Sequence, residues 1–536
     1  MQERPSRSEA CSIACPGFCS QCHDQPVYKV FRFHANETCE QDFATNTLGA
    51  IWTQVLAYAD VEGLDGQYIC YSLSSKYCSA PKTNPLDTTS LFPKPKPADF
   101  QVPGASGERV KTFHLDARLA VSSEANCTSS LCCRGDNYLS EDKPLLSASA
   151  YGSFLCDTPY DLGLAALQTI GPLTGTGKGK NDEHFAWTLY TGALVSHDPA
   201  SQISKALTQY TETSIYGMFK HYLSGPVFAA LGNHDTSPAN IDSPHNLPGR
   251  LGEQQSWNYE HLAGLWRHEG WISRETADEA RTHYGGYSVK TYYRLRIIAF
   301  NTDFWYRHNI LTFINTTDPD NSGMFSWMIE EFGWDGTNAL PDPTDLLYQI
   351  VDGYSPHVIA NIFFGHTHED EFMVYYTNNE AVQDAGNAFT TGWIMPSITP
   401  LTNLNSGFRV YEVDMGDFNI YEAYTFYSTV SDYPTLEHTG PTFEIEYSTR
   451  AAYGLAAGWD EDAPLNATFW HRVTNAMEKE VKLVSLHNTY QGKRSVKSPR
   501  CTTAICQKAK VCYMRSGSVA LGSQCPQGYG SVQSAF

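Results

Sequence analysis

The chain has little positive charge and no long hydrophobic run. Its 536 residues include 37 Lys and Arg against 58 Asp and Glu, which gives a formal net charge of −21 at pH 7. Such a chain repels nucleic acid, so the composition excludes a nucleic-acid partner. No stretch of about 18 apolar residues resembles a transmembrane helix, and no hydrophobic tail resembles a lipid-anchor signal. Residues 1–22 also lack the apolar core of a signal peptide.

Cysteines and glycosylation sequons are plentiful, and both indicate the secretory route. The chain has 15 cysteines, several of them closely spaced: Cys127, Cys132, Cys133, Cys501, Cys506 and Cys512. Asn-x-Ser/Thr sequons begin at Asn36, Asn126, Asn315 and Asn466. We therefore expect disulfides and an oxidising compartment. The missing signal peptide contradicts this expectation, and we interpret it as an incomplete N-terminus.

The pattern along the chain predicts four segments. Residues 47–59 have apolar side chains at helical spacing, in a region bracketed by cysteines. Alternating prolines at 92–97 predict a stiff linker. Beyond it, apolar strands at 185–190 and 294–300 alternate with helical stretches, and a helix is predicted over 465–486. The segments are a cysteine-bearing helical region (1–91), a Pro-rich linker (92–106), an α/β layered domain (107–430) and a helical, cysteine-rich subdomain (431–536).

Two short polar strings follow apolar stretches that we predict to be strands. Gly-Asn-His-Asp at 232–235 follows the apolar run 226–231, and Gly-His-Thr-His at 365–368 follows 357–364. Each string places amide or imidazole ligands at the C-terminal end of a strand, where open α/β sheets build their sites. Either string alone is compatible with a turn or a polar loop. The two together favour a common site.

These strings resemble the ligand motifs of calcineurin-like metallophosphoesterases. Other stretches resemble the fungal acid sphingomyelinase-like phosphodiesterases: Ser-Glu-Ala-Asn-Cys (123–127), Cys-Cys-Arg (132–134), residues 210–235, Asn-Thr-Asp-Phe-Trp (301–305), Trp-Asp-Gly-Thr-Asn (334–338) and Tyr-Met-Arg-Ser-Gly-Ser-Val (513–519). The resemblance implies a saposin-like lipid-handling segment, a metallophosphoesterase domain and a helical C-terminal subdomain. It also implies two zinc ions and phosphodiester substrates such as sphingomyelin. The implied location is extracellular, or the vacuolar or lysosomal lumen, with peripheral lipid contact.

The resemblance assigns roles to individual histidines and an asparagine. Asn233 and His366 match ligands of one metal, and His368 matches a ligand of the other. His234 matches the general acid that protonates the leaving alkoxide. His197 matches a histidine that faces the phosphate. The alternative for His234 and His197 is a structural role in a cap or in the core.

Two features of the family's metal site are missing from the sequence. The family's Thr-Gly-Asp, whose Asp bridges the two metals, reads Thr-Gly-Ala here and ends at Ala193. The family also has a strand ending in Gly-His before Trp-Asp-Gly. Here Glu331 runs through Phe-Gly straight into Trp334, so that histidine is absent. A bridging carboxylate holds the two cations together, so its loss weakens both sites.

The family's Asp-x-His motif aligns near residues 112–114 in two ways. Without a gap, Thr112 takes the place of Asp and His114 keeps the ligand position. If residues are deleted after Leu115, His114 is an ordinary strand residue and both ligands are lost. We prefer the ungapped alignment, which makes His114 a metal ligand.

The predicted metal ligands are therefore His114, Asn233, His366 and His368, two for each metal, with no carboxylate among them. Zinc should bind such sites weakly, because losing even outer-sphere partners costs about 10–100-fold in affinity. We expect a sphingomyelinase-like phosphodiesterase in which this chain hydrolyses substrate poorly. The alternatives are a non-catalytic relative that binds lipid or a partner, and an incomplete gene model of an active enzyme. The sequence does not define an oligomeric state.

Overall fold

The computed structural model describes residues 47–73, 77–79, 81, 99–120, 148–179, 182–198, 203–318, 320–331, 343–377 and 382–533. Several features of the sequence lie outside these residues: the cysteines and sequons before residue 47 and at 126–133, the prolines at 92–97, and the junction that follows Glu331.

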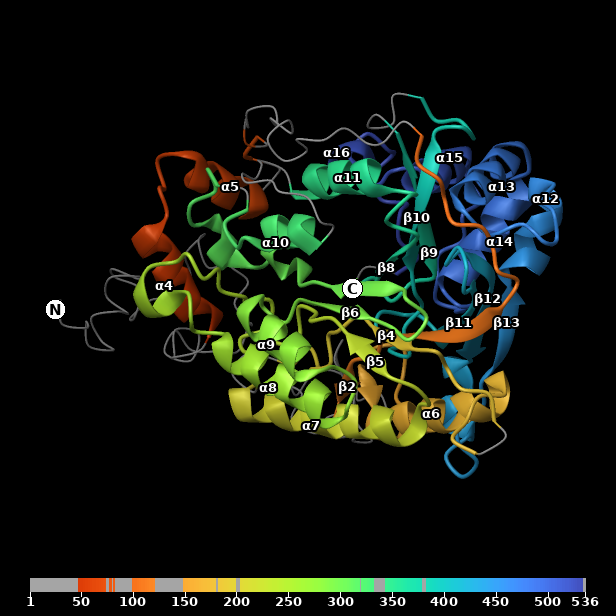
Figure 1. Ribbon diagram of the computed structural model, residues 1–536, viewed down its shortest axis with the longest axis horizontal. Helices are drawn as coiled ribbons and strands as arrows, with labels where there is room; N and C mark the ends of the chain where they lie inside the picture. Colours follow the sequence, from red (N-terminus) through yellow and green to blue (C-terminus); the bar gives the residue numbers. More distant parts are fainter. Residues whose placement is uncertain are drawn as a thin grey trace, which may run out of the picture.

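A mixed six-stranded sheet forms the centre of the fold, in the order β13-β12-β11-β1-β4-β5 (Figure 1). Its strands are β1 (Arg109–Leu115), β4 (Thr188–Tyr190), β5 (Val227–Ala229), β11 (Ser406–Asp414), β12 (Ile420–Ser428) and β13 (Glu444–Ser448). β1 is parallel to β4, and β4 is parallel to β5, whereas β1 is antiparallel to β11. The carboxyl ends of β1, β4 and β5 therefore meet at one edge of the sheet.

A second sheet has the order β8-β10-β9, and β8 is parallel to β10. Its strands are β8 (Ile362–Phe364), β9 (Glu371–Tyr376) and β10 (Ala388–Ile394). Two strand pairs complete the described sheets: β2 (Leu119–Ala120) with β3 (Thr158–Pro159), and β6 (Tyr287–Lys290) with β7 (Arg296–Ala299). The Gly-His-Thr-His string follows β8, so its two histidines lie where the second sheet meets the central sheet.

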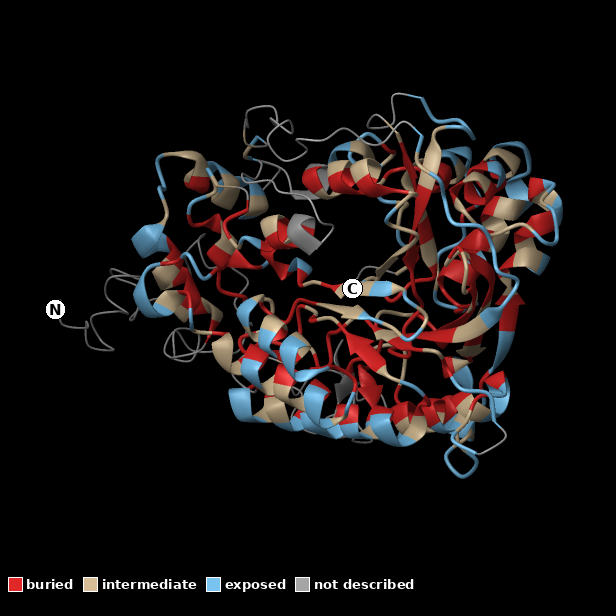
Figure 2. Ribbon diagram, in the orientation of Figure 1, coloured by how far each residue is buried: buried red, intermediate tan, exposed pale blue. Residues whose placement is uncertain are grey.

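Four helices lie along one side of the central sheet, where Figure 1 draws them at the bottom. They are α6 (Tyr160–Thr174), α7 (Lys205–Tyr222), α8 (Ser256–His268) and α9 (Arg274–Thr282). Their sheet-facing sides are buried and their outer sides are exposed (Figure 2). The Ser204 hydroxyl caps α7 by accepting a hydrogen bond from Leu207 N at 3.2 Å. This burial of one helical face is what holds the layer on the sheet.

The C-terminal residues form a helical layer beside the second sheet. Its helices are α12 (Leu455–Ala457), α13 (Ala467–Lys479), α14 (Val481–Gln491), α15 (Ala504–Met514) and α16 (Val519–Gly522). Disulfides join Cys501 to Cys506 and Cys512 to Cys525. The helix predicted over 465–486 is two helices, because the backbone leaves the helical conformation at Glu480.

Near the start of the described chain, α4 (Leu48–Tyr58) and α5 (Leu64–Leu73) precede the sheet. Trp52 and Val55 of α4 pack with Ile310 and Phe313 in a separate apolar cluster. A disulfide joins Cys70 to Cys78. The predicted helix at 47–59 is confirmed. Between this region and the C-terminal helices lie α10 (Met324–Glu331) and α11 (Pro343–Tyr354).

The structure confirms the mixed α/β class and the disulfides predicted for the C-terminal region. It also confirms the strands predicted at 185–190 and 294–300, as β4 and β7. Among the described helices, none is both long and apolar enough to span a membrane.

Candidate functional site

The ends of three strands approach one another closely at the edge of the sheets. Gly365, after β8, lies so close to Thr191 and Asp116 that a Cβ on it would lie 2.3 Å from Thr191 Oγ1 and 2.8 Å from Asp116 Oδ2. Asp116 Oδ2 accepts a hydrogen bond from His366 N at 3.3 Å. The sequence therefore needs glycine at 365 for the two sheets to meet here.

Asn233 and His366 lie close together, and Arg118 contacts Asn233. Asn233 Oδ1 is 3.3 Å from His366 Nδ1 and accepts a hydrogen bond from Arg118 Nη2 at 3.2 Å. Asn233 Nδ2 donates to Asn240 Oδ1 at 2.8 Å, which fixes the orientation of the amide. The carbonyl oxygen that would ligate a metal is thus already bonded to a guanidinium.

His197 lies between Asp157 and Arg118. Its Nδ1 is 2.8 Å from Asp157 Oδ1, and its backbone N donates to Asp157 Oδ2 at 2.7 Å. Its Nε2 contacts Arg118 Nη1. Arginine can only donate, so Nε2 accepts and Nδ1 carries the proton that Asp157 accepts. Burial raises the pKa of Asp157, but the contact with His197 outweighs it, and the net pKa is lowered.

His234 stands next to His197, with ring centroids 4.2 Å apart. Its Nδ1 is 3.3 Å from the carbonyl oxygen of Ser196. The ring is buried, and burial together with the charge of Arg118 lowers its pKa well below the ordinary value. His234 is therefore neutral near pH 7.

His368 has the hydrogen bonding that suits a metal-binding histidine. Its Nδ1 donates to the carbonyl oxygen of Leu401 at 2.6 Å, and its buried Nε2 has no hydrogen-bond partner within the described chain. A backbone acceptor on Nδ1 fixes the tautomer and leaves the Nε2 lone pair free. The buried Lys493 holds the same loop by donating from Nζ to His368 O at 2.6 Å.

His114, which the ungapped alignment predicts to be a metal ligand, lies inside β1 (Arg109–Leu115). His114 is fully buried within β1, and its ring lies edge-on to Phe363 at 5.2 Å. Neither ring nitrogen has a hydrogen-bond partner in the described structure, and burial lowers its pKa to about 3. Thr112 is likewise a buried residue of β1, paired with Tyr411 of β11. These surroundings favour the gapped alignment, in which His114 is an ordinary strand residue.

Asp116, beyond the end of β1, reaches the site instead. Its Oδ1 accepts a hydrogen bond from Ser397 Oγ at 3.0 Å, and its Oδ2 faces His366 N. Arg118 follows two residues later, so its guanidinium reaches the same edge. Asp116, Arg118 and Asp157 were not among the residues predicted from the sequence. The Asp-Ala-Arg at 116–118 is the signal in the sequence that could have located the first two.

Ala193 lies in the turn after β4, in a left-handed conformation with φ 69°. The carboxylate of the buried Asp235 holds this turn by accepting from Ala193 N at 2.7 Å and Leu194 N at 2.6 Å. Gly192 precedes it with φ 84°, and a Cβ there would lie 2.2 Å from Gly232 N. The turn is therefore tightly packed, but the methyl group of Ala193 cannot bind a metal.

These residues do not fit a pair of zinc ions. No group of three or more His, Cys, Asp or Glu side chains in the described residues is arranged to hold a metal. The Asp116 carboxyl group and His368 Nε2 are of the types that bind a divalent cation. Asn233 Oδ1, however, already accepts a hydrogen bond from Arg118, and the Ala193 side chain has no atom that could bind a metal. The guanidinium would repel a cation placed at Asn233.

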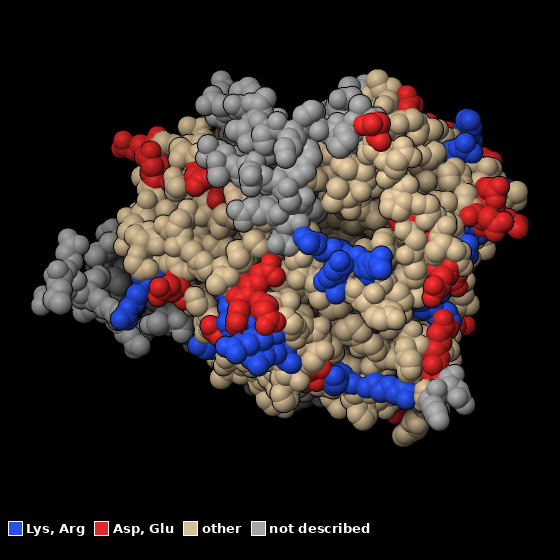
Figure 3. All heavy atoms as spheres, viewed as in Figure 1, with Lys and Arg blue, Asp and Glu red and all other residues tan. Residues whose placement is uncertain are grey.

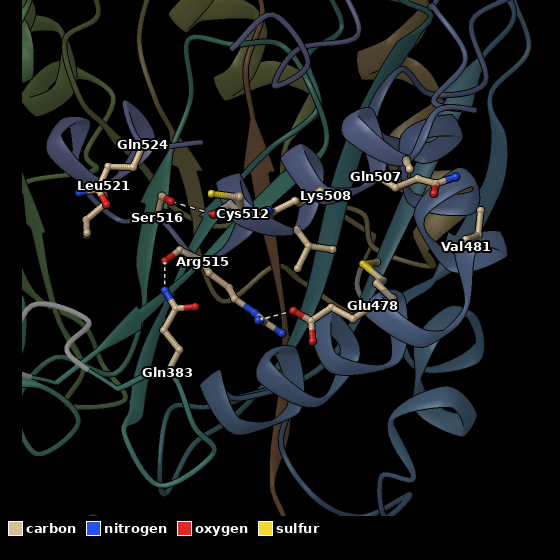
Figure 4. Close-up of a pocket in the computed structure, with 13 residues that line it drawn as sticks. Gln383, Glu478, Val481, Gln507, Lys508, Cys512, Arg515, Ser516, Leu521 and Gln524 are labelled. Carbon is tan, nitrogen blue, oxygen red and sulfur yellow. Dashed lines mark hydrogen bonds and ion pairs between the residues drawn. The ribbon is translucent and has the colours of Figure 1, made fainter. Parts of the chain in front are cut away.

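A separate cavity of about 480 Å³ lies among the C-terminal helices and contains none of these residues (Figure 4). Arg515 lines it, but its guanidinium is bonded to Glu478 Oε1 at 2.8 Å. Acidic and basic side chains form small separate groups on the face shown in Figure 3, without a broad basic surface on its described part. The residues predicted for the site therefore lie at the strand ends and not in this cavity.

The chain is similar to several curated phosphodiesterases. It is 28% identical over 382 residues to sphingomyelin phosphodiesterase 2 of Caenorhabditis elegans, covering 64% of this chain and 59% of that protein. It is 29% identical over 438 residues to the Bos taurus sphingomyelin phosphodiesterase, covering 76% and 64%. Its homologues are sphingomyelin phosphodiesterases.

A third relative is named for a different substrate. The cyclic GMP-AMP phosphodiesterase SMPDL3A of Mus musculus is 27% identical over 430 residues, covering 73% of this chain and 84% of that protein. The chain spans about three fifths of the length of the first sphingomyelin phosphodiesterases that it matches. No protein-family model matches it.

Proposed function

We propose that this chain is a sphingomyelin phosphodiesterase-like protein whose strand-end site takes the phosphodiester of a phospholipid such as sphingomyelin. The observation that carries the proposal is the convergence of Asn233, His366 and His197 on one edge, with Asn233 Oδ1 3.3 Å from His366 Nδ1. The named activity of the homologues supports the same substrate class. The shared chemistry of all the relatives is a phosphodiester, whether its alcohol is a lipid or a nucleoside.

We further propose that Asp116-Ala-Arg118 occupies the position of the family's Asp-x-His, with arginine replacing the histidine ligand. The contact of Asp116 with His366 N supports this alignment. In the family's two-metal chemistry, zinc generates hydroxide and clamps the phosphoryl oxygens. In this chain Asp116, His366 and His368 remain as metal-binding groups, while Arg118 and Ala193 stand in place of the two that would complete the pair. Zinc-dependent hydrolysis should therefore be slow.

The remaining roles belong to this chain's own side chains. Asn233 and His366 orient the phosphodiester at the mouth of the site, where His366 is exposed. His197, held by Asp157, and the adjacent His234 face the phosphate and the leaving alkoxide. A saposin-like action of α4 and α5 at a lipid surface, and a secreted or lumenal location, belong to the same proposal. The disulfides support an oxidising compartment.

Binding to mixed micelles that contain sphingomyelin tests this function. Micelles with ceramide, which lacks the phosphodiester, are the lipid control. Wild-type protein should bind the sphingomyelin micelles more strongly, and His197→Ala and Asn233→Ala should reduce the difference. His438→Ala, at an exposed residue outside this site, should leave it unchanged. Equal binding to both micelles would contradict a phosphodiester site.

A further inference from the structure

We propose that Arg118 makes this site bind a phosphodiester monoanion without a divalent metal. The inference rests on the proposed function, because it concerns the same strand-end site. It adds three points: Arg118 carries the positive charge, binding does not require a metal, and the site prefers a phosphodiester to a phosphomonoester.

Arg118 is a buried cation without a carboxylate partner. Arg118 is only 3% exposed, and its guanidinium bonds to Asn233 Oδ1 and His197 Nε2, neither of which is a carboxylate. The carboxyl groups of Asp116 and Asp157 act on it only from beyond ion-pair distance. No ion pair joins it to any carboxylate of the described residues. Arg409 shows the usual arrangement, since its equally buried guanidinium is paired with Asp370. A buried charge without a counter-ion is costly, so Arg118 is expected to receive an anion.

The guanidinium also has a donor left over. Arg118 Nε is buried and has no hydrogen-bond partner in the described part of the chain. An unmade hydrogen bond at a buried donor costs about 1–3 kcal/mol, more at a charged group. A phosphoryl oxygen would supply the missing acceptor, and guanidinium groups bind phosphates in forked geometry.

The site is open at one side. His366 is exposed, and Tyr306 lies against it with ring centroids 5.2 Å apart. The His197 side chain is 27% exposed. We propose that an oxyanion approaches Arg118 from the side where these rings reach the surface.

The charge of the site favours a diester over a monoester. One guanidinium supplies the positive charge, while the Asp157 carboxylate is already bonded to His197 and Asp116 lies close by. A phosphodiester carries one negative charge, whereas a phosphomonoester carries about −1.5 to −2 near neutral pH. The extra charge of a monoester would meet these carboxyl groups, and the other buried cation near Asp116, Lys493, is already bonded to His368 O.

Calorimetric titration of the full-length protein tests the proposal. The probes are glycerophosphocholine as the diester, phosphocholine as the monoester, and inorganic phosphate, each in EDTA and in zinc. We expect the diester to bind in EDTA as well as in zinc, and more tightly than the other two. Arg118→Met should weaken its binding about 10- to 100-fold, and Arg118→Lys less, because lysine keeps the charge but not the fork. Arg281→Met, at a surface ion pair, is the matched control and should change nothing.

Three results would overturn the proposal or separate it from the proposed function. Diester binding that requires zinc would contradict the role of Arg118 but leave the phosphodiester site intact. Unchanged binding by folded Arg118→Met would do the same. Absence of diester binding in both buffers would contradict the proposed function as well. If Arg118→Met fails to fold, wild type in EDTA and Arg118→Lys still decide the question.

Discussion

Arg118 Nη2 donates a hydrogen bond to Asn233 Oδ1 at 3.2 Å, and this contact sets a fixed positive charge at the ligand atom of a predicted metal site. Arg118 replaces a histidine ligand in the proposed alignment, and Ala193 replaces the bridging carboxylate. The same chain keeps Asp116, His366 and His368. We therefore propose that the site no longer holds two cations but keeps the groups that would surround a phosphoryl oxygen.

Arg118→His should increase zinc binding. The change removes the repelling charge and adds an imidazole beside Asn233 and His366. We expect the dialysed variant to retain more zinc than the wild type by elemental analysis, and Arg118→His with Ala193→Asp to retain more again. Arg118→Lys keeps the charge and should stay at the wild-type content. Equal zinc in all four proteins would show that Arg118 does not control the metal.

Ala193→Asp alone should not restore hydrolysis. The left-handed φ of 69° at Ala193 is one that Asp tolerates better than most residues, so the fold should survive. Arg118 would still repel a cation at Asn233, so a chromogenic phosphodiester should be hydrolysed no faster than by the wild type. Large turnover by the single variant would show that the guanidinium is no obstacle.

Gly192→Ala should strongly destabilise the fold. Its φ of 84° disfavours a side chain, and its Cβ would lie 2.2 Å from Gly232 N. We expect a loss of more than about 2 kcal/mol in urea unfolding. Gly107→Ala has a similar φ of 78° but open space around the Cβ, so it should cost only about 1 kcal/mol. Equal losses would show that the two turns do not touch as described.

Glu212→Gln should stabilise the protein at neutral pH. Glu212 of α7 is fully buried, and burial, followed by the charge of Asp235, raises its pKa well above the ordinary value. The folded state therefore binds a proton more tightly than the unfolded state, and stability is lost as pH rises through the folded pKa. Gln removes this loss, so the urea midpoint should rise at about pH 7.5 and change less at about pH 4.5. Glu437→Gln, at an exposed residue, should shift neither midpoint. A Glu212→Gln shift independent of pH would contradict the assignment.

Much of the site could be predicted from the sequence because it follows local rules. The two polar strings lie at the ends of β5 and β8, and the apolar runs before them predict those strands. Arg118 and Asp116 could not be assigned in this way, because His114 offered an equally plausible ligand until packing showed its ring against Phe363. Asp157 was unpredictable because its contact with His197 depends on the tertiary fold. The break between α13 and α14 at Glu480 could not be predicted, because no proline or glycine lies there.

The zinc content of the dialysed wild-type protein, measured beside its turnover of sphingomyelin, decides whether Arg118 takes the place of a metal. We expect well below two zinc ions per chain and little or no turnover, because Arg118 and Ala193 leave the pair without its ligands. About two zinc ions per chain with clear turnover would show that other residues complete the pair and that Arg118 does not take the place of a metal.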